Sequence, residues 1–185
     1  MEMHARLQEA IRDAAVRRGR RLEYFTVGWN LIEAAVALGA GLFAGSIALI
    51  GFVVDSLIET SSGAVLLWRL QEGEEGEKRE RMALKLVGIS LLALAAYVAI
   101  DATKGLILKD PPEESLLGII LAAVSLTVMP LLARAKRKVA AKLNSQALMA
   151  DSHQTDICAY LSAILLLGLG FNALFGWWWA DPGAA

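Results

Sequence analysis

Residues 46–68 read SIALIGFVVDSLIETSSGAVLLW, an apolar run that contains two carboxylates, Asp55 and Glu59, and no basic residue. A helix rises 1.5 Å per residue, so about 20 residues cross the ~30 Å hydrocarbon core of a bilayer. The run is long enough for one crossing. It therefore predicts a transmembrane helix that carries two acidic side chains at membrane depth.

Similar apolar runs flank this one on both sides. The chain has 185 residues, of which 56% are hydrophobic and 20% charged, and its mean hydropathy is +0.50. The charges are concentrated in blocks between the apolar runs. We predict an all-α integral membrane protein with five transmembrane helices; besides 46–68, the spans cover about 24–43, 83–107, 115–133 and 145 to 177–179.

The predicted organisation has three parts. Residues 1–22 form an amphipathic helix at the cytoplasmic membrane face, residues 23–180 form the transmembrane bundle, and residues 181–185 form a short tail. Lysine and arginine are concentrated in alternate connections, at 12–21, 69–81 and 134–142, whereas the other side has only Lys104 and Lys109. Basic connections remain in the cytoplasm, so the amino terminus is predicted to be cytoplasmic.

Asp55 and Glu59 are four residues apart, which places both on one face of a helix. A charged carboxylate near the midplane costs several kcal/mol, so both should face the bundle interior and have partners. Two neighbouring carboxylates repel each other unless they are protonated or neutralised by a cation. A divalent metal ion is the simplest neutraliser, and a structural hydrogen-bonding pair between helices is the alternative.

A second polar cluster, ADSHQTD at 150–156, lies near the start of the last span. From Ser145, Asp151 is about 9 Å deep and Asp156 about 16 Å deep, so this cluster should meet Asp55 and Glu59 near the midplane. His153 and Asp156 share a helix face, whereas Asp151 points elsewhere. Carboxylates with an imidazole suit Zn²⁺, and also Mn²⁺, Fe²⁺ or Co²⁺. For His153 a packed hydrogen-bonding role stands equally open.

Two further residues have alternative interpretations. Glu33, near the middle of the first span, belongs either to the site or a proton path, or to a helix–helix hydrogen bond. Cys158 is expected to pack rather than to bind metal. The sequence contains no catalytic triad, phosphate-binding glycine loop or nucleic-acid surface, so we expect neither an enzyme nor a prosthetic group. The basic blocks favour contact with the lipid bilayer.

Three stretches together resemble a known family: RLEYFTVGWNLIEA at 21–34, GSIALIGFVVDSLIE at 45–59 and ADSHQTDICAYLSAILL at 150–166. They are similar to the transmembrane half of cation diffusion facilitators, which are divalent-metal efflux transporters, in a branch without the soluble carboxy-terminal domain. The resemblance implies a four-ligand site, made by a D-x-x-x-[DE] pair on the second helix and an [HD]-x-x-x-D pair on the fifth. Asp55 and Glu59 match the first pair.

The fifth helix fits the second pair in two ways. Alignment on Asp156 places Ser152 at the first position, and alignment on Asp151 places Thr155 at the second. The resemblance also implies a homodimer of six-span chains. Five spans are visible here, and WWWADPGAA at 177–185 stands where the connection to a sixth would begin.

The resulting expectation is a secondary transporter that exports Zn²⁺ or a similar divalent cation in exchange for protons. Protons and metal would compete for the same carboxylates, because protonation removes the ligands. Two alternatives remain open at this point. One is a scaffold or metal-binding membrane protein whose polar groups hold helices together, and the other is a passive cation channel without proton coupling.

Overall fold

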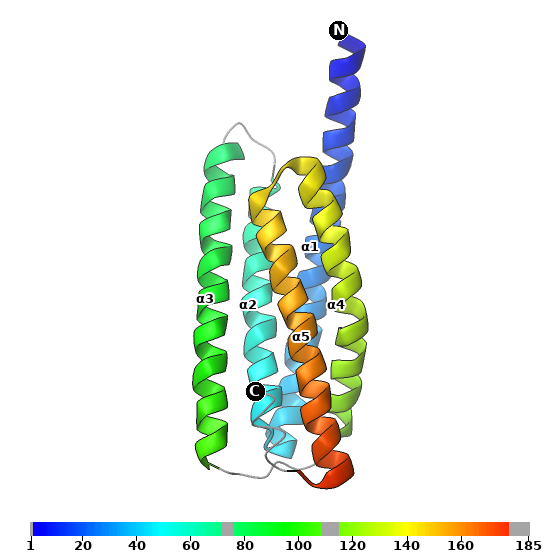
Figure 1. Cartoon of the computed structure of the whole chain (residues 1–185). Coiled ribbons are helices and arrows are strands. Elements are labelled where there is room, and N and C mark those ends of the chain that lie inside the picture. The colour runs from blue at the N-terminus through cyan, green and yellow to red at the C-terminus, as the bar shows by residue number, and fades with distance from the viewer. Residues whose placement is uncertain (1, 72–75, 109–114, 178–185) are drawn as a thin grey trace.

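A computed structural model describes residues 2–71, 76–108 and 115–177, and the regular structure in these ranges is entirely helical. The helices alternate in direction, and Figure 1 shows them as an elongated antiparallel bundle. The prediction of an all-α fold with five long helices is confirmed. The helices are α1 (Glu2–Ala44), α2 (Ile47–Arg69), α3 (Gly76–Leu108), α4 (Leu116–Leu143) and α5 (Gln146–Phe175).

Two tight turns join the helices in pairs, α1 with α2 and α4 with α5. Gly45 in the first turn has φ +63°, a left-handed conformation that glycine adopts without a Cβ clash. Asn144 ends α4 with φ 49°. Ser46 and Ser145 then cap α2 and α5, each accepting a hydrogen bond from the backbone amide three residues further on. Local sequence therefore sets both hairpins.

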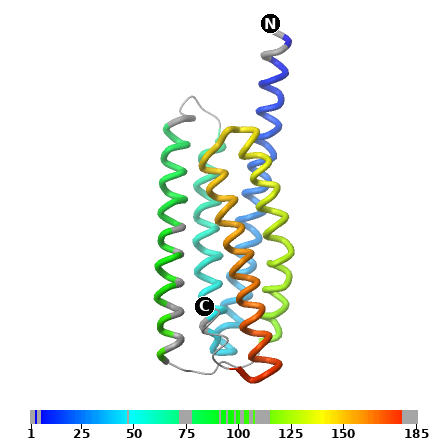
Figure 2. The backbone as a smooth tube through the Cα atoms, viewed as in Figure 1, coloured from blue at the N-terminus to red at the C-terminus, as the bar shows by residue number. Residues whose placement is uncertain are grey.

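Four helices enclose the core of the bundle. Helix α1 packs against α2 and α4, and α5 packs against α4 and α2. Helix α3 contacts α2 and α5 and lies at one side of the bundle, as Figure 2 shows in green. The space between α2 and α5 is therefore lined by α1 and α4 as well, and it holds most of the buried polar side chains described below.

The polarity of the bundle is reversed relative to a soluble protein. Large apolar side chains such as Leu92, Leu117 and Leu131 are exposed on its outside, whereas carboxylates are buried inside. Within the described residues, α1, α2, α4 and α5 are long and apolar enough to cross a membrane. The chain is therefore an integral, multi-pass membrane protein. The fifth predicted span, in α3, is present as a helix of 33 residues, and its crossing stays a prediction.

The amino-terminal segment leads into the first span without a break. Helix α1 runs without interruption from Glu2 to Ala44, so the expected amphipathic helix at 1–22 is continuous with the first span. No proline falls within this range to end the helix. The start of α1 extends beyond the other helices in Figure 1. We call that end of the bundle the N-terminal end, and the end with Gly45 the opposite end.

Candidate ion site between α2 and α5

Two acidic side chains of α2 point into the bundle. Asp55 and Glu59 are one helical turn apart and are 1% and 0% exposed. Neither oxygen of Asp55 accepts a hydrogen bond from an N–H or O–H group in the described part of the chain, and neither does Oε2 of Glu59. Buried carboxylate oxygens without donors are costly unless a proton or a cation neutralises them. The pair thus has the chemistry of a cation site.

Helix α5 presents a polar face to these carboxylates. The Thr155 hydroxyl donates a hydrogen bond to Oε1 of Glu59 over 2.6 Å, and the thiol of Cys158 lies beside both acidic groups. Asp151 and Thr155 are one turn apart on this face, and both are fully buried. Of the two alignments that the sequence allowed, the structure therefore places the Asp151–Thr155 pair toward α2.

Asp151 is bound on both of its oxygens. Ser62 of α2 donates to Oδ1 over 2.7 Å, and the Lys136 ammonium of α4 donates to Oδ2 over 2.5 Å. The same ammonium lies 3.2 Å from Oε2 of Glu23 on α1, and both side chains of this pair are fully buried. A single ionic cluster therefore connects α1, α2, α4 and α5.

Asp156 and His153 lie on another side of α5 from the residues that face Asp55 and Glu59. The Asp156 side chain is 26% exposed and forms an ion pair with Arg137 of α4. His153 is 62% exposed, with Nδ1 3.8 Å from Oδ2 of Asp156. The reason is geometric, because each residue turns a helix by about 100° and Asp156 directly follows the inward-facing Thr155.

Glu33 of α1 forms a helix–helix contact, which was one of its two predicted roles. Its Oε1 accepts hydrogen bonds from the Ser125 hydroxyl of α4 and from Nε1 of Trp29. Its Oε2 is buried and has no donor among the described residues. Glu33 therefore joins α1 to α4 and keeps one oxygen unpaired inside the bundle.

Sequence reasoning missed Lys136 and Glu23. Lys136 was assigned to the basic connector 134–142, yet it is 0% exposed. A usable signal was present, because Lys136 interrupts a stripe of residues that recur at helical spacing and are all buried. The stripe consists of Ser125, Met129, Leu132, Val139 and Ala140. Glu23 likewise lies at helical spacing from other buried residues of α1, namely Thr26, Asn30 and Glu33.

The side chains are close together but not in a metal-coordinating arrangement. Among the described residues, no three or more His, Cys, Asp or Glu groups are placed to hold a metal ion. Binding of an ion between α2 and α5 would therefore require these side chains to move closer together. The arrangement supplies the donor types for such a site without the final coordination distances.

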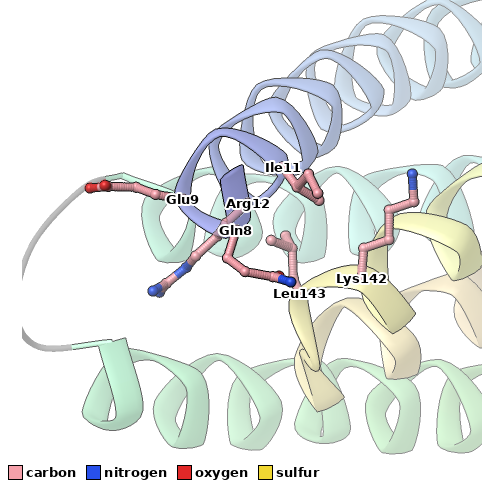
Figure 3. Close-up of a pocket in the computed structure, with 6 residues that line it drawn as sticks. All are labelled: Gln8, Glu9, Ile11, Arg12, Lys142 and Leu143. Carbon is pink, nitrogen blue, oxygen red and sulfur yellow. The ribbon is translucent and has the colours of Figure 1, made fainter. Parts of the chain in front are cut away.

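A surface hollow lies away from this cluster, at the N-terminal end between α1 and α4. Its volume is about 480 Å³, and Figure 3 shows Ile11 and Leu143 on its two walls. The polar side chains that line it are Gln8, Glu9, Arg12 and Lys142. Because Glu9 is the only carboxylate among the described residues that line it, this hollow does not have the ligand chemistry found between α2 and α5.

A bundle with an apolar exterior and buried ionisable groups is characteristic of the class of polytopic membrane proteins that move ions. Residues 25–185 match the cation efflux transmembrane domain, and the chain belongs to this family. The family resemblance of the sequence is thereby confirmed.

Individual relatives extend this similarity. An uncharacterized transporter, sll1263, of Synechocystis sp. is 27% identical over 90% of this chain and 56% of its own length. The cation-efflux pump FieF of Shewanella oneidensis is 23% identical over 84% of this chain and 55% of its own. The cation-efflux pump FieF of Citrobacter koseri is 26% identical over 79% of this chain and 51% of its own length. The chain spans about half the length of the curated relatives it matches.

Proposed function

We propose that the chain exports a divalent cation, with Zn²⁺ preferred, in exchange for protons, and that the ion binds between α2 and α5. The observation that carries this proposal is the pair Asp55 and Glu59, three of whose buried oxygens have no N–H or O–H donor among the described residues. Similarity to relatives named cation-efflux pumps supports the direction of transport. The proposed role is transport, with no catalysis.

The proposed ligands are the Asp55 and Glu59 carboxylates of α2, together with the Thr155 hydroxyl and the Cys158 thiol of α5. A thiolate with carboxylates suits Zn²⁺, and carboxylates also accept Mn²⁺, Fe²⁺ or Co²⁺. Asp156, and His153 beside it, would join this set only if α5 rotated by about 100°. We therefore assign them no place in the site.

The position of the pair suits transport across a membrane. Asp55 is eight residues from Ile47 and fourteen from Arg69, or about 12 Å and 21 Å along α2. An ion held there is far from both membrane faces. Protons can replace the ion on the same oxygens, which would couple the two fluxes. As the resemblance implies, we expect the functional unit to be a homodimer.

We propose that the N-terminal end of the bundle faces the cytoplasm. The support is the concentration of arginine and lysine in 12–21, 69–81 and 134–142, even though Lys136 is buried and adds nothing to that charge. A cysteine that replaces the exposed Gln8 should react with a membrane-impermeant thiol reagent only after the cells are opened. Labelling in intact cells would show instead that the N-terminal end faces the outside.

Metal flux in vesicles tests the proposed function. The purified full chain is reconstituted with a Zn²⁺-sensitive dye and a pH-sensitive dye, and each is followed after Zn²⁺ is added outside. Asp55→Asn keeps the shape of the side chain and removes its charge, so Zn²⁺ uptake and proton counterflow should both be lost. Asp156→Asn is the matched control on α5 and should retain both fluxes.

The alternative functions predict different outcomes. A passive channel would carry Zn²⁺ without proton counterflow. A scaffold would carry neither, with the wild-type chain as inactive as Asp55→Asn. If Asp156→Asn abolished flux and Asp55→Asn did not, the assignment of the site to α2 would be incorrect.

A further inference from the structure

Lys136 is an ammonium group enclosed entirely by the bundle. It lies on α4, seven residues before the last residue of that helix, Leu143. It is therefore about 10 Å from the end of α4 that lies at the N-terminal end of the bundle. Its Nζ is 2.5 Å from Oδ2 of Asp151, 3.2 Å from Oε2 of Glu23 and 3.3 Å from Oγ1 of Thr155. A buried ammonium is tolerated only with such partners, so its position is tightly determined.

These contacts remove Asp151 from the donors available to an ion. Lys136 is bound to one oxygen of that carboxylate, and the Ser62 hydroxyl is bound to the other. Asp55 and Glu59, one to two turns before Ser62 on α2, retain three oxygens without an N–H or O–H donor among the described residues. The α5 carboxylate that faces α2 is thus occupied, whereas the α2 carboxylates are open.

We propose that Lys136 is a specificity-determining residue that withholds Asp151 from the transported cation. This inference rests on the proposed function of the site between α2 and α5. With Asp151 held by the ammonium, the ion meets two carboxylates, one hydroxyl and one thiol. Without the ammonium, Asp151 becomes a third carboxylate ligand, and hard oxygen-preferring ions such as Mn²⁺ gain relative to Zn²⁺.

Lys136 also positions Thr155. The ammonium donates to Oγ1 of Thr155, and the Thr155 hydroxyl can then direct its single proton to Oε1 of Glu59 over 2.6 Å. Lys136 thereby holds both Asp151 and Thr155, the two polar groups of α5 that face α2. Its removal changes the number of charges and the direction of a hydrogen bond together.

Metal binding to the purified full chain in detergent tests the inference, with Zn²⁺ and Mn²⁺ titrated separately. Lys136→Met removes the ammonium and keeps an unbranched side chain. We expect the ratio of Mn²⁺ to Zn²⁺ affinity to rise by about 10- to 100-fold, the range found for groups that orient metal ligands. Lys136→Arg keeps the charge and should keep the wild-type ratio. Lys138→Met, at an exposed position two residues along α4, is the matched control.

An unchanged ratio in Lys136→Met, or the same change in Lys136→Arg, would overturn the inference. If Lys136→Met does not fold, Zn²⁺ binding to Asp151→Asn provides a second test of the inference. Because Asp151 is withheld from the ion, its amide variant should bind Zn²⁺ nearly as the wild type does, whereas Asp55→Asn should not. Equal losses in the two variants would show that Asp151 is a ligand. Failure of the wild-type chain to bind Zn²⁺ would instead overturn the proposed function itself.

Discussion

Thr155 connects the two halves of the buried polar cluster. Its hydroxyl donates to Glu59 on α2 and accepts from Lys136 on α4, and the side chain is fully buried. Such a hydroxyl contributes more than its own hydrogen bond, because its loss leaves buried partners on α2 and α4 unsatisfied.

Replacement of Thr155 by valine should therefore destabilise the chain. Valine keeps the volume and branching of threonine but cannot donate to Glu59, and an unsatisfied buried acceptor costs about 1–3 kcal/mol. Thr155→Ser keeps the hydroxyl and should lose less. Denaturant unfolding in detergent micelles measures both free energies. If the valine variant unfolded with the same free energy as the wild type, the Thr155–Glu59 hydrogen bond would contribute nothing to stability.

Single residues also show how far sequence reasoning reached. The inward direction of Asp55 and Glu59 followed from their spacing in an otherwise apolar helix. The rotation of α5 could not be predicted in the same way, because residues 151–156 are all polar and mark no preferred face. The contacts of Asp151 with Ser62 and Lys136 fix that rotation. Both partners lie on other helices, α2 and α4, so the local sequence of α5 does not reveal them.

Helix α3 lies at one side of the bundle and packs against α2 and α5. Glu80 near its start connects it to both. The carboxylate accepts hydrogen bonds from Nε of Arg69 over 2.5 Å, from the Ser145 hydroxyl over 2.9 Å and from the Ala147 amide over 2.7 Å. It therefore pairs with the last residue of α2 and satisfies one free amide in the first turn of α5.

The attachment of α3 should depend on pH. Burial alone would raise the pKa of Glu80, but hydrogen bonds from Ala147, Arg69 and Ser145 outweigh it and lower the pKa below its ordinary value of 4.5. A lowered folded-state pKa stabilises the fold above the unfolded value, and this contribution is lost as the pH falls through the folded value. Wild-type stability should therefore fall toward that of Glu80→Gln below about pH 4.5.

Thermal unfolding of the two proteins between pH 3.5 and 7 measures this effect. The difference in melting temperature should be constant near neutral pH and should narrow in acid. Glu9→Gln, at an exposed position on α1, is the matched control and should follow the wild type throughout. A difference that did not change with pH would show that the Glu80 contacts contribute nothing through charge.

The helical elements were easier to predict than their ends. Runs of about 20 apolar residues identify spans because no other structure satisfies the backbone in lipid. The continuity of α1 from Glu2 to Ala44 was not predicted, since a change from charged to apolar residues alters the environment of a helix without ending it. Only a proline or a capping sequence would have marked a break.

At the scale of the whole molecule, charge is distributed unevenly between interior and surface. Among the described residues, five carboxylates are buried against one ammonium: Glu23, Glu33, Asp55, Glu59 and Asp151 against Lys136. An interior with this excess of acidic groups requires bound protons or cations to be stable. That requirement connects the fold to the proposed exchange of metal ions for protons.

Zinc-edge anomalous diffraction from crystals of the full chain grown with Zn²⁺ locates the ion directly. We expect an anomalous peak between α2 and α5, with zinc–oxygen distances of about 2.0–2.2 Å to Asp55 and Glu59. Asp55→Asn crystals should lack this peak. A zinc peak at Asp156 and His153 on the outer side of α5, with none beside Asp55, would contradict the account.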